Sequence, residues 1–99
     1  MTLQEFILEF SPYDNITGYK NIYINSHNMI SFEGEYYFID GRMIEFRITI
    51  KKDNSYKVQF VRLSDSAYYH ANKHGIRQQI DTIFNWWTSK YKKELQMFF

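Results

Sequence analysis

Two histidines, His70 and His74, stand four residues apart in the segment His-Ala-Asn-Lys-His. On a helix, this spacing places both imidazoles on one face, where they could share a zinc ion. The glutamate that follows the first histidine in zinc-protease helices is replaced by Ala71, and a third ligand would have to come from Asp65, Asp81 or a distant residue. We therefore expect two surface histidines near a helix end, where the helix dipole favours their charged form, and no bound metal.

Three glutamates, Glu33, Glu35 and Glu45, fall on one face of a predicted sheet, with Glu35 directly opposite Glu45. Like charges that oppose each other destabilise a sheet. Solvent screening on an open face is the simplest interpretation. The functional alternative is an acidic docking surface in which Arg47 pairs with Glu33. An acid–base or metal-binding carboxylate pair is a third interpretation, although the sequence places no nucleophile or histidine beside it.

A flank of the predicted C-terminal helix combines an aromatic ring with lysines: Gln79, Trp86, Lys90, Lys93 and Met97 recur there at helical spacing. Trp86 could widen the face that packs on the sheet while its N–H stays hydrated. It could also anchor a protein partner, because tryptophan is enriched in interface hot spots. A third interpretation is stacking of a nucleic-acid base on Trp86 while Lys90 and Lys93 hold phosphates.

Whole classes of site are excluded by composition. The chain has no cysteine, which excludes disulfides, a thiol nucleophile and cysteine-ligated metal or haem centres. Four glycines in 99 residues leave little material for a phosphate-binding loop, and no spacing typical of a catalytic triad is present. We therefore expect a non-enzymatic protein without a cofactor.

The central half of the chain alternates apolar and polar residues with a period of two, which predicts an antiparallel sheet buried on one side. Four strands are expected, over residues 19–25, 29–38, 42–50 and 56–63. Three-residue loops between them keep the apolar residues of neighbouring strands on one face, pairing Tyr36 with Ile44 and Phe32 with Ile48. These loops are Ser26-His27-Asn28, Ile39-Asp40-Gly41 and Lys52-Asp53-Asn54.

Helices are predicted on both sides of this meander. Thr2 and Glu5 form a capping-box pattern before a short helix over residues 3–10, which Pro12 terminates. A second short helix is expected from Ser64 or Asp65 to residue 71. From residue 76 onward, one apolar stripe at a period of 3.6 residues predicts a long helix that covers the sheet. The stripe consists of Ile76, Ile80, Ile83, Phe84, Trp87, Tyr91, Leu95 and Phe98.

The expected fold is thus a single α+β domain over residues 1–99: a short N-terminal helix, a four-stranded antiparallel meander, and a long C-terminal helix on one sheet face. Aromatic residues make up 20% of the chain and support a real core despite its length. No apolar run reaches the roughly 18 residues of a membrane span, and the N-terminal residues lack a basic start, so a cytoplasmic protein is expected.

Charge is distributed unevenly. Residues 1–50 carry seven acids against three bases, whereas residues 51–99 carry nine bases against four acids. Such a polarised small domain suits an inhibitor or adaptor that covers a protein surface. Frequent Ile, Asn, Lys, Tyr and Phe suggest a low-GC genome, so one concrete version is a phage or mobile-element protein that blocks a host nuclease or defence complex, its acidic face imitating nucleic acid.

Two alternatives accompany this expectation. The first is a nucleic-acid-binding module that uses the basic, aromatic C-terminal half. The second is a homodimer, in which an edge strand of the meander extends the sheet of a second copy.

Overall fold

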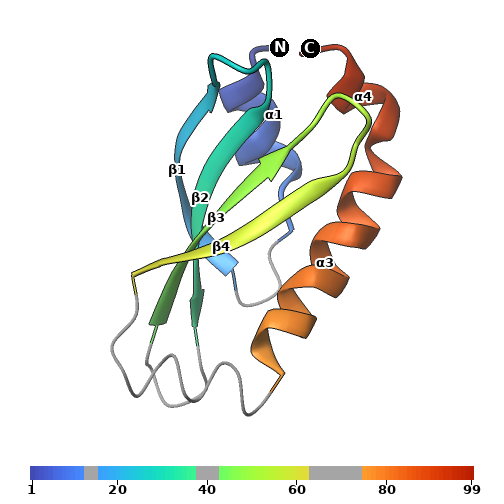
Figure 1. Ribbon diagram of the computed structural model, residues 1–99. Coiled ribbons are helices and arrows are strands. Elements are labelled where there is room, and N and C mark those ends of the chain that lie inside the picture. Colours follow the sequence, from blue (N-terminus) through green and yellow to red (C-terminus); the bar gives the residue numbers. More distant parts are fainter. Residues whose placement is uncertain (13–15, 38–42, 63–74) are drawn as a thin grey trace.

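The computed structural model describes residues 1–12, 16–37, 43–62 and 75–99. Helix α1 (Leu3–Phe10) is followed by strands β1 (Ile16–Ile24), β2 (Ile30–Tyr37), β3 (Met43–Ile50) and β4 (Tyr56–Arg62), and then by helices α3 (Ile76–Lys90) and α4 (Lys92–Gln96) (Figure 1). The strands form one antiparallel sheet in the order β1-β2-β3-β4. The predicted α+β fold is confirmed.

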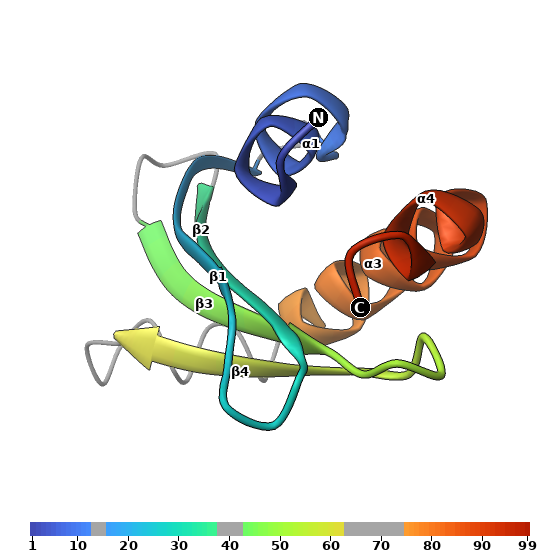
Figure 2. The same ribbon diagram turned by 90° about the horizontal axis from the view of Figure 1, so that it is seen from above.

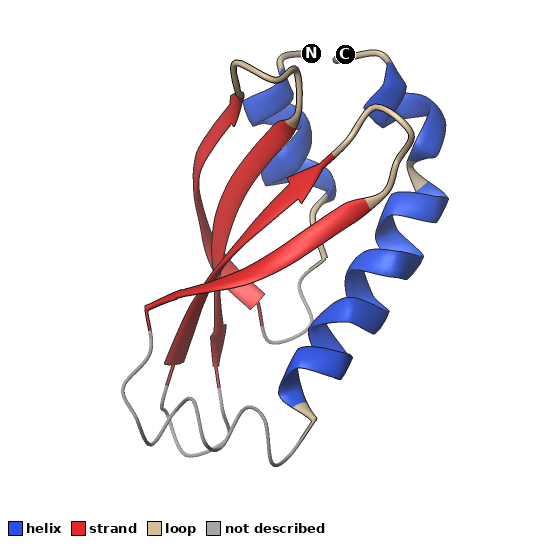
Figure 3. Cartoon of the chain, viewed as in Figure 1, coloured by secondary structure: helices blue, strands red, loops and turns tan. Residues whose placement is uncertain are grey.

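The three helices of the described residues lie on one side of the sheet (Figure 2). The N-terminus and the C-terminus are at the same end of the molecule, so α1 and α3 run antiparallel (Figure 3). Between the helices and the sheet lies a core to which every element contributes. Its largest fully buried side chains are Trp87, Phe32, Phe46, Phe84, Ile7, Ile16, Ile30, Ile44, Ile48, Ile50, Ile80 and Leu95.

The register of the central strands agrees with the predicted one. Tyr36 pairs with Ile44 and Phe32 with Ile48, so the apolar residues of β2 and β3 share the core face. Asn28 and Asn54, the last residues of two predicted three-residue loops, both adopt positive φ (57° and 68°). Asparagine tolerates this left-handed conformation better than most residues, which explains how these short loops close. The third predicted loop, together with the short helix predicted up to residue 71, lies outside the described residues.

Strand β1 is longer and less regular than predicted. It begins at Ile16 rather than at residue 19, and its register against β2 shifts twice. Each shift contains a residue with positive φ, Gly18 at 64° and Asn21 at 53°. These are β-bulges, in which one extra residue bends the strand. As a result Tyr19 and Ile22, three residues apart, both pack against the core.

The C-terminal helix is interrupted, whereas the sequence predicts one continuous helix. Tyr91 leaves helical geometry (φ −104°, ψ 26°) and separates α3 from α4. Hydrogen bonds nevertheless continue across it, from the N–H of Tyr91 to the carbonyl of Trp87 and from the N–H of Leu95 to the carbonyl of Tyr91. The apolar stripe therefore keeps its direction, and Leu95 and Phe98 still reach the core.

Aromatic contacts fix α1 against α3 and α4. The Phe6 ring lies 5.7 Å from the Tyr91 ring and 5.4 Å from the Phe98 ring, centroid to centroid. The indole N–H of Trp87 donates a hydrogen bond of 2.7 Å to the carbonyl of Phe10. This bond satisfies one of the carbonyls that the end of a helix leaves free. The predicted capping box at the other end of α1, between Thr2 and Glu5, is confirmed.

Candidate functional site

The predicted cluster of glutamates lies on the sheet face opposite the helices. The charge of its first member, Glu33, is balanced by a neighbouring side chain. Glu33 accepts a 2.9 Å hydrogen bond from the guanidinium of Arg47, which the sequence analysis paired with it. The side-chain amide of Asn21 donates to the other carboxylate oxygen at 3.1 Å. Chiefly because of the Arg47 hydrogen bond, the pKa of Glu33 is lower than its ordinary value.

Glu35 and Glu45 stand directly opposite each other, as predicted, but each has its own partner. The Lys20 ammonium lies 3.7 Å from a carboxylate oxygen of Glu45. The Tyr37 hydroxyl donates to Glu35 at 2.9 Å, and this hydrogen bond raises the pKa of Tyr37. Opposite charge and hydrogen bonding thus offset the repulsion that such a pair creates.

The expected open, solvent-screened face is wrong for two of the three carboxylates. Glu33 is only 8% exposed and Glu45 only 5%. Together with Lys20 and Arg47, the three glutamates carry a net charge of only −1. An acidic surface able to imitate nucleic acid needs accessible, unbalanced charge, so this face supports that interpretation poorly.

The flank of α3 around Trp86 does not stay together as one surface. Trp86 is 56% exposed, and the Lys90 ammonium lies over its ring at 5.0 Å from the centroid. Gln79 instead accepts a 2.7 Å hydrogen bond from the Tyr36 hydroxyl of the sheet. Lys93 is exposed on α4. The structure therefore brings Trp86 and Lys90 together and engages Gln79 with the sheet instead.

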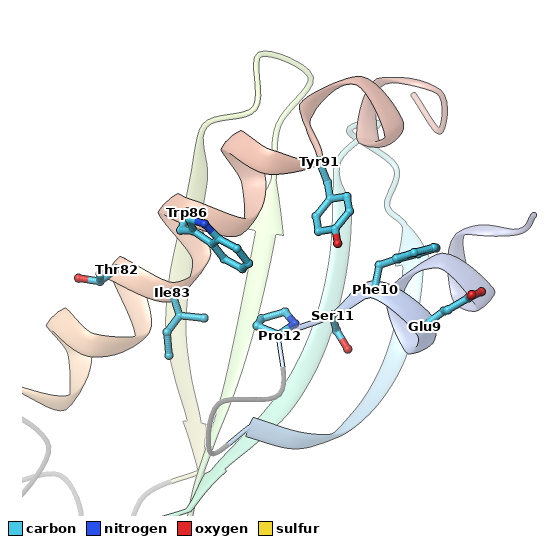
Figure 4. A pocket seen from close by; sticks show the side chains of 8 residues that line it. All are labelled: Glu9, Phe10, Ser11, Pro12, Thr82, Ile83, Trp86 and Tyr91. Carbon is cyan, nitrogen blue, oxygen red and sulfur yellow. The ribbon is translucent and has the colours of Figure 1, made fainter.

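Trp86 lines a hollow between α3 and the end of α1 (Figure 4). The hollow has a volume of about 520 Å³. We call it the upper hollow, although in the views of Figures 1 and 4 it lies beneath the second hollow, which is next to the two chain termini. Its lining residues are Glu9, Phe10, Ser11, Pro12, Thr82, Ile83, Trp86 and Tyr91. Most of this surface is aromatic or aliphatic, as in sites that bind an apolar group.

A second hollow of about 390 Å³, the lower hollow, lies between α1 and the segment from Tyr91 to Phe98, which includes α4. Phe10 and Tyr91 line both hollows, and their rings, 5.7 Å apart, form the ridge between them. The lower hollow is lined by Met1, Phe6, Phe10, Tyr91, Glu94, Met97 and Phe98. We refer to the two hollows together as the helix groove.

The α1 side of the helix groove is the part that sequence reasoning missed. Ser11 lines the upper hollow and is 3% exposed, and its side-chain oxygen has no hydrogen-bond partner. The Tyr19 hydroxyl donates to the Pro12 carbonyl and so fixes the chain just after Ser11. The sequence marks Pro12 only as a helix stop, and periodicity cannot show which other helix the end of α1 approaches.

His70 and His74, which the sequence predicts as surface histidines without a metal, lie outside the described residues. Within the described ranges, no group of three or more histidine, aspartate or glutamate side chains is arranged to hold a metal ion. None of the helices described by the structure has the length and apolar character that a membrane crossing requires.

Comparison with models of known protein families, with curated protein sequences and with solved structures finds no significant match.

Proposed function

We propose that this chain is a non-enzymatic binding protein that docks on another protein through the helix groove. The observation that carries the proposal is the exposed Trp86 ring at the edge of a hollow of about 520 Å³ lined mainly by apolar side chains. Tryptophan is among the residues that most often dominate the free energy of protein–protein binding. Soluble domains rarely expose a large apolar surface unless it serves an interaction.

The walls of the groove are held in place without a partner. The indole of Trp87 is hydrogen-bonded to Phe10, and the Phe10 and Tyr91 rings are in contact. A preformed groove loses little conformational entropy on binding, which favours affinity. In its narrower form, the proposal is that the chain is an inhibitor or adaptor of a macromolecular partner, for example of a host nuclease or defence complex. This narrower form is based on the size and composition of the chain.

Binding of nucleic acid is the alternative, and the geometry supports it less. Lys90 already covers one face of the Trp86 ring, and Lys93 lines neither hollow. The charged residue that lines the upper hollow is Glu9, whose carboxylate repels phosphate. A groove that tracks a nucleic-acid backbone is normally positively charged.

A photo-crosslinking amino acid in place of Trp86, introduced in cells that naturally make the protein, tests the proposal. We expect a discrete adduct that protease removes and nuclease does not. The matched control carries the same group in place of Tyr23, an exposed aromatic residue of β1 outside the groove, and should give no such adduct. An adduct sensitive to nuclease, or equal adducts from both positions, would contradict the proposal.

Titration of labelled DNA and RNA at several salt concentrations tests the alternative directly. Because bound phosphates release counterions, genuine nucleic-acid binding weakens steeply as salt rises. We expect flat titrations even at low salt. Salt-sensitive binding that is lost in Trp86→Ala or Lys93→Glu would favour the nucleic-acid interpretation over docking on a protein.

A further inference from the structure

The two hollows lie in line along the seam between antiparallel helices. On the α3–α4 side, the upper hollow is lined by residues 82–91 and the lower hollow by residues 91–98. At 1.5 Å of rise per residue, their midpoints are about 12 Å apart. Two side chains seven or eight residues apart on a partner helix have about this separation. An extended strand would span the same distance with about four residues.

The surface of the groove suits an apolar helix face. Met1 and Met97 border the lower hollow, and both are largely exposed. Methionine side chains are flexible and polarisable, so they adapt to the shape of an entering side chain. The Phe10–Tyr91 ridge would fit between two successive anchor side chains, as ridges pack into grooves at helix–helix contacts.

The charged side chains that line the two hollows are acidic: Glu9 in the upper hollow and Glu94 in the lower one. Glu5 lies one helical turn before Glu9 on α1. Two cations lie close by, the N-terminal ammonium of Met1 at the lower hollow and Lys90, whose ammonium lies 5.0 Å from the centre of the Trp86 ring and 5.4 Å from that of Tyr91 but lines neither hollow. These carboxylates are complementary to a basic partner.

We infer that the partner segment is a basic amphipathic helix, which places two apolar side chains in the two hollows and Lys or Arg side chains against Glu9 and Glu94. This inference rests on the proposed protein-binding function and names the segment that the groove takes. An acidic helix, an extended segment and a second copy of this chain are the competing occupants.

Three synthetic peptides of about 18 residues, long enough to span the groove as a helix, distinguish these occupants. The first is a lysine-rich helix with leucines at positions i and i+7, and the second replaces its lysines by glutamates. The third keeps the composition of the first but places the leucines in alternation, as on a strand. Fluorine NMR of protein labelled with fluorotryptophan reports binding, with the Trp86 signal assigned by Trp86→Phe.

We expect the basic helix to shift the Trp86 signal, leave the buried Trp87 signal nearly unchanged, and bind at least about tenfold more tightly than either other peptide. The double variant Glu9→Gln/Glu94→Gln should bind the basic peptide about five- to tenfold more weakly than wild type. The variant Tyr23→Lys/Val61→Lys raises the net charge by the same amount at exposed strand positions, and its affinity for the basic peptide should fall less. The Trp87 signal shows that each variant is folded.

Equal binding of all three peptides, tighter binding of the acidic or alternating peptide, or no shift at millimolar basic peptide would overturn the inference. So would a Trp86 signal that changes with protein concentration alone, which would indicate a second copy as the occupant. The crosslinking experiment at position 86 is independent of the peptides. If it yields a protein adduct while the basic helix fails, the proposed function stands and only the helical partner is rejected.

Discussion

Glu33 illustrates how single residues on the sheet face are held by charge and hydrogen bonding. Its carboxylate is buried and bonded to Arg47 and Asn21, and its pKa is lowered. A carboxyl group whose pKa is lower in the folded state stabilises the protein above its unfolded-state pKa, and this contribution is lost as the pH falls through the folded-state pKa. The sequence predicts the Arg47 pairing from cross-strand register, but the Asn21 contact depends on a bulge that it does not reveal.

Replacement Glu33→Gln should therefore lower the free energy of unfolding at pH 7 by about 1–2 kcal/mol, through loss of a charge-assisted hydrogen bond. The difference from wild type should shrink as the pH falls below the ordinary glutamate pKa of about 4.3 and through the lowered pKa of folded Glu33, because the wild-type carboxyl becomes protonated. Urea unfolding at pH 7 and along an acid series measures this change, with Glu35→Gln as a control in which the replaced side chain is more exposed. An equal difference at pH 7 and throughout the acid series would refute the role of ionised Glu33.

Among the elements, β1 is where prediction from sequence is least complete. The register of β2 and β3 follows from alternation, and asparagines that accept positive φ close the turn before β2 and the turn after β3. The β1 segment also alternates over part of its length, and nothing in that alternation marks the bulges at Gly18 and Asn21. Tyr91 interrupts the C-terminal helix without a proline or glycine, so local propensity does not indicate that break either.

Substitution at Asn21 tests the bulge, because a regular strand and a bulge predict opposite orders of stability. In a regular strand, valine is more favourable than glycine by up to about 1 kcal/mol. At a φ of 53° the β-branched side chain is strained, by roughly 1–2 kcal/mol, whereas glycine is not. We expect Asn21→Val to be less stable than Asn21→Gly in thermal unfolding; the reverse order would show that β1 is regular there.

On the scale of the whole molecule, both edges of the sheet carry features that hinder strand addition. Bulges distort β1, and the Arg77 guanidinium donates to the Val58 carbonyl of β4 at 3.3 Å while lying 4.3 Å from the centre of the Phe60 ring. Natural sheets block edge-to-edge pairing by such means. The homodimer through a sheet edge that the sequence allowed is therefore not the arrangement that this geometry favours.

We expect the wild-type chain to sediment as a monomer at micromolar concentration. Arg77→Ala should increase self-association, since it frees the Val58 carbonyl and uncovers Phe60. The matched control is Gln78→Ala, at the next exposed position of α3. Analytical ultracentrifugation of all three proteins provides the measurement. A wild-type dimer that Arg77→Ala leaves unchanged would show that Arg77 does not protect the edge.

The helix groove is also a property of the whole molecule, which explains why the sequence did not predict it as a groove. Trp86 and Met97, which line it, were identifiable because they fall beside the apolar stripe of the C-terminal segment. The opposite wall comes from residues about 75 positions earlier in the chain, Phe10, Ser11 and Pro12. Hydrophobic periodicity describes one element at a time, so it cannot predict which two helices form a groove.

The most direct test of the account is quantitative affinity capture from cells that naturally make the protein, with wild type, Trp86→Glu and Glu35→Gln compared by mass spectrometry. Trp86→Glu places a charge at the groove, whereas Glu35→Gln removes one from the opposite sheet face, and circular dichroism checks that both variants are folded. We predict that the proteins captured by wild type are lost with Trp86→Glu and retained with Glu35→Gln. Retention by Trp86→Glu with loss by Glu35→Gln would contradict docking through the helix groove and assign the interaction to the carboxylate face.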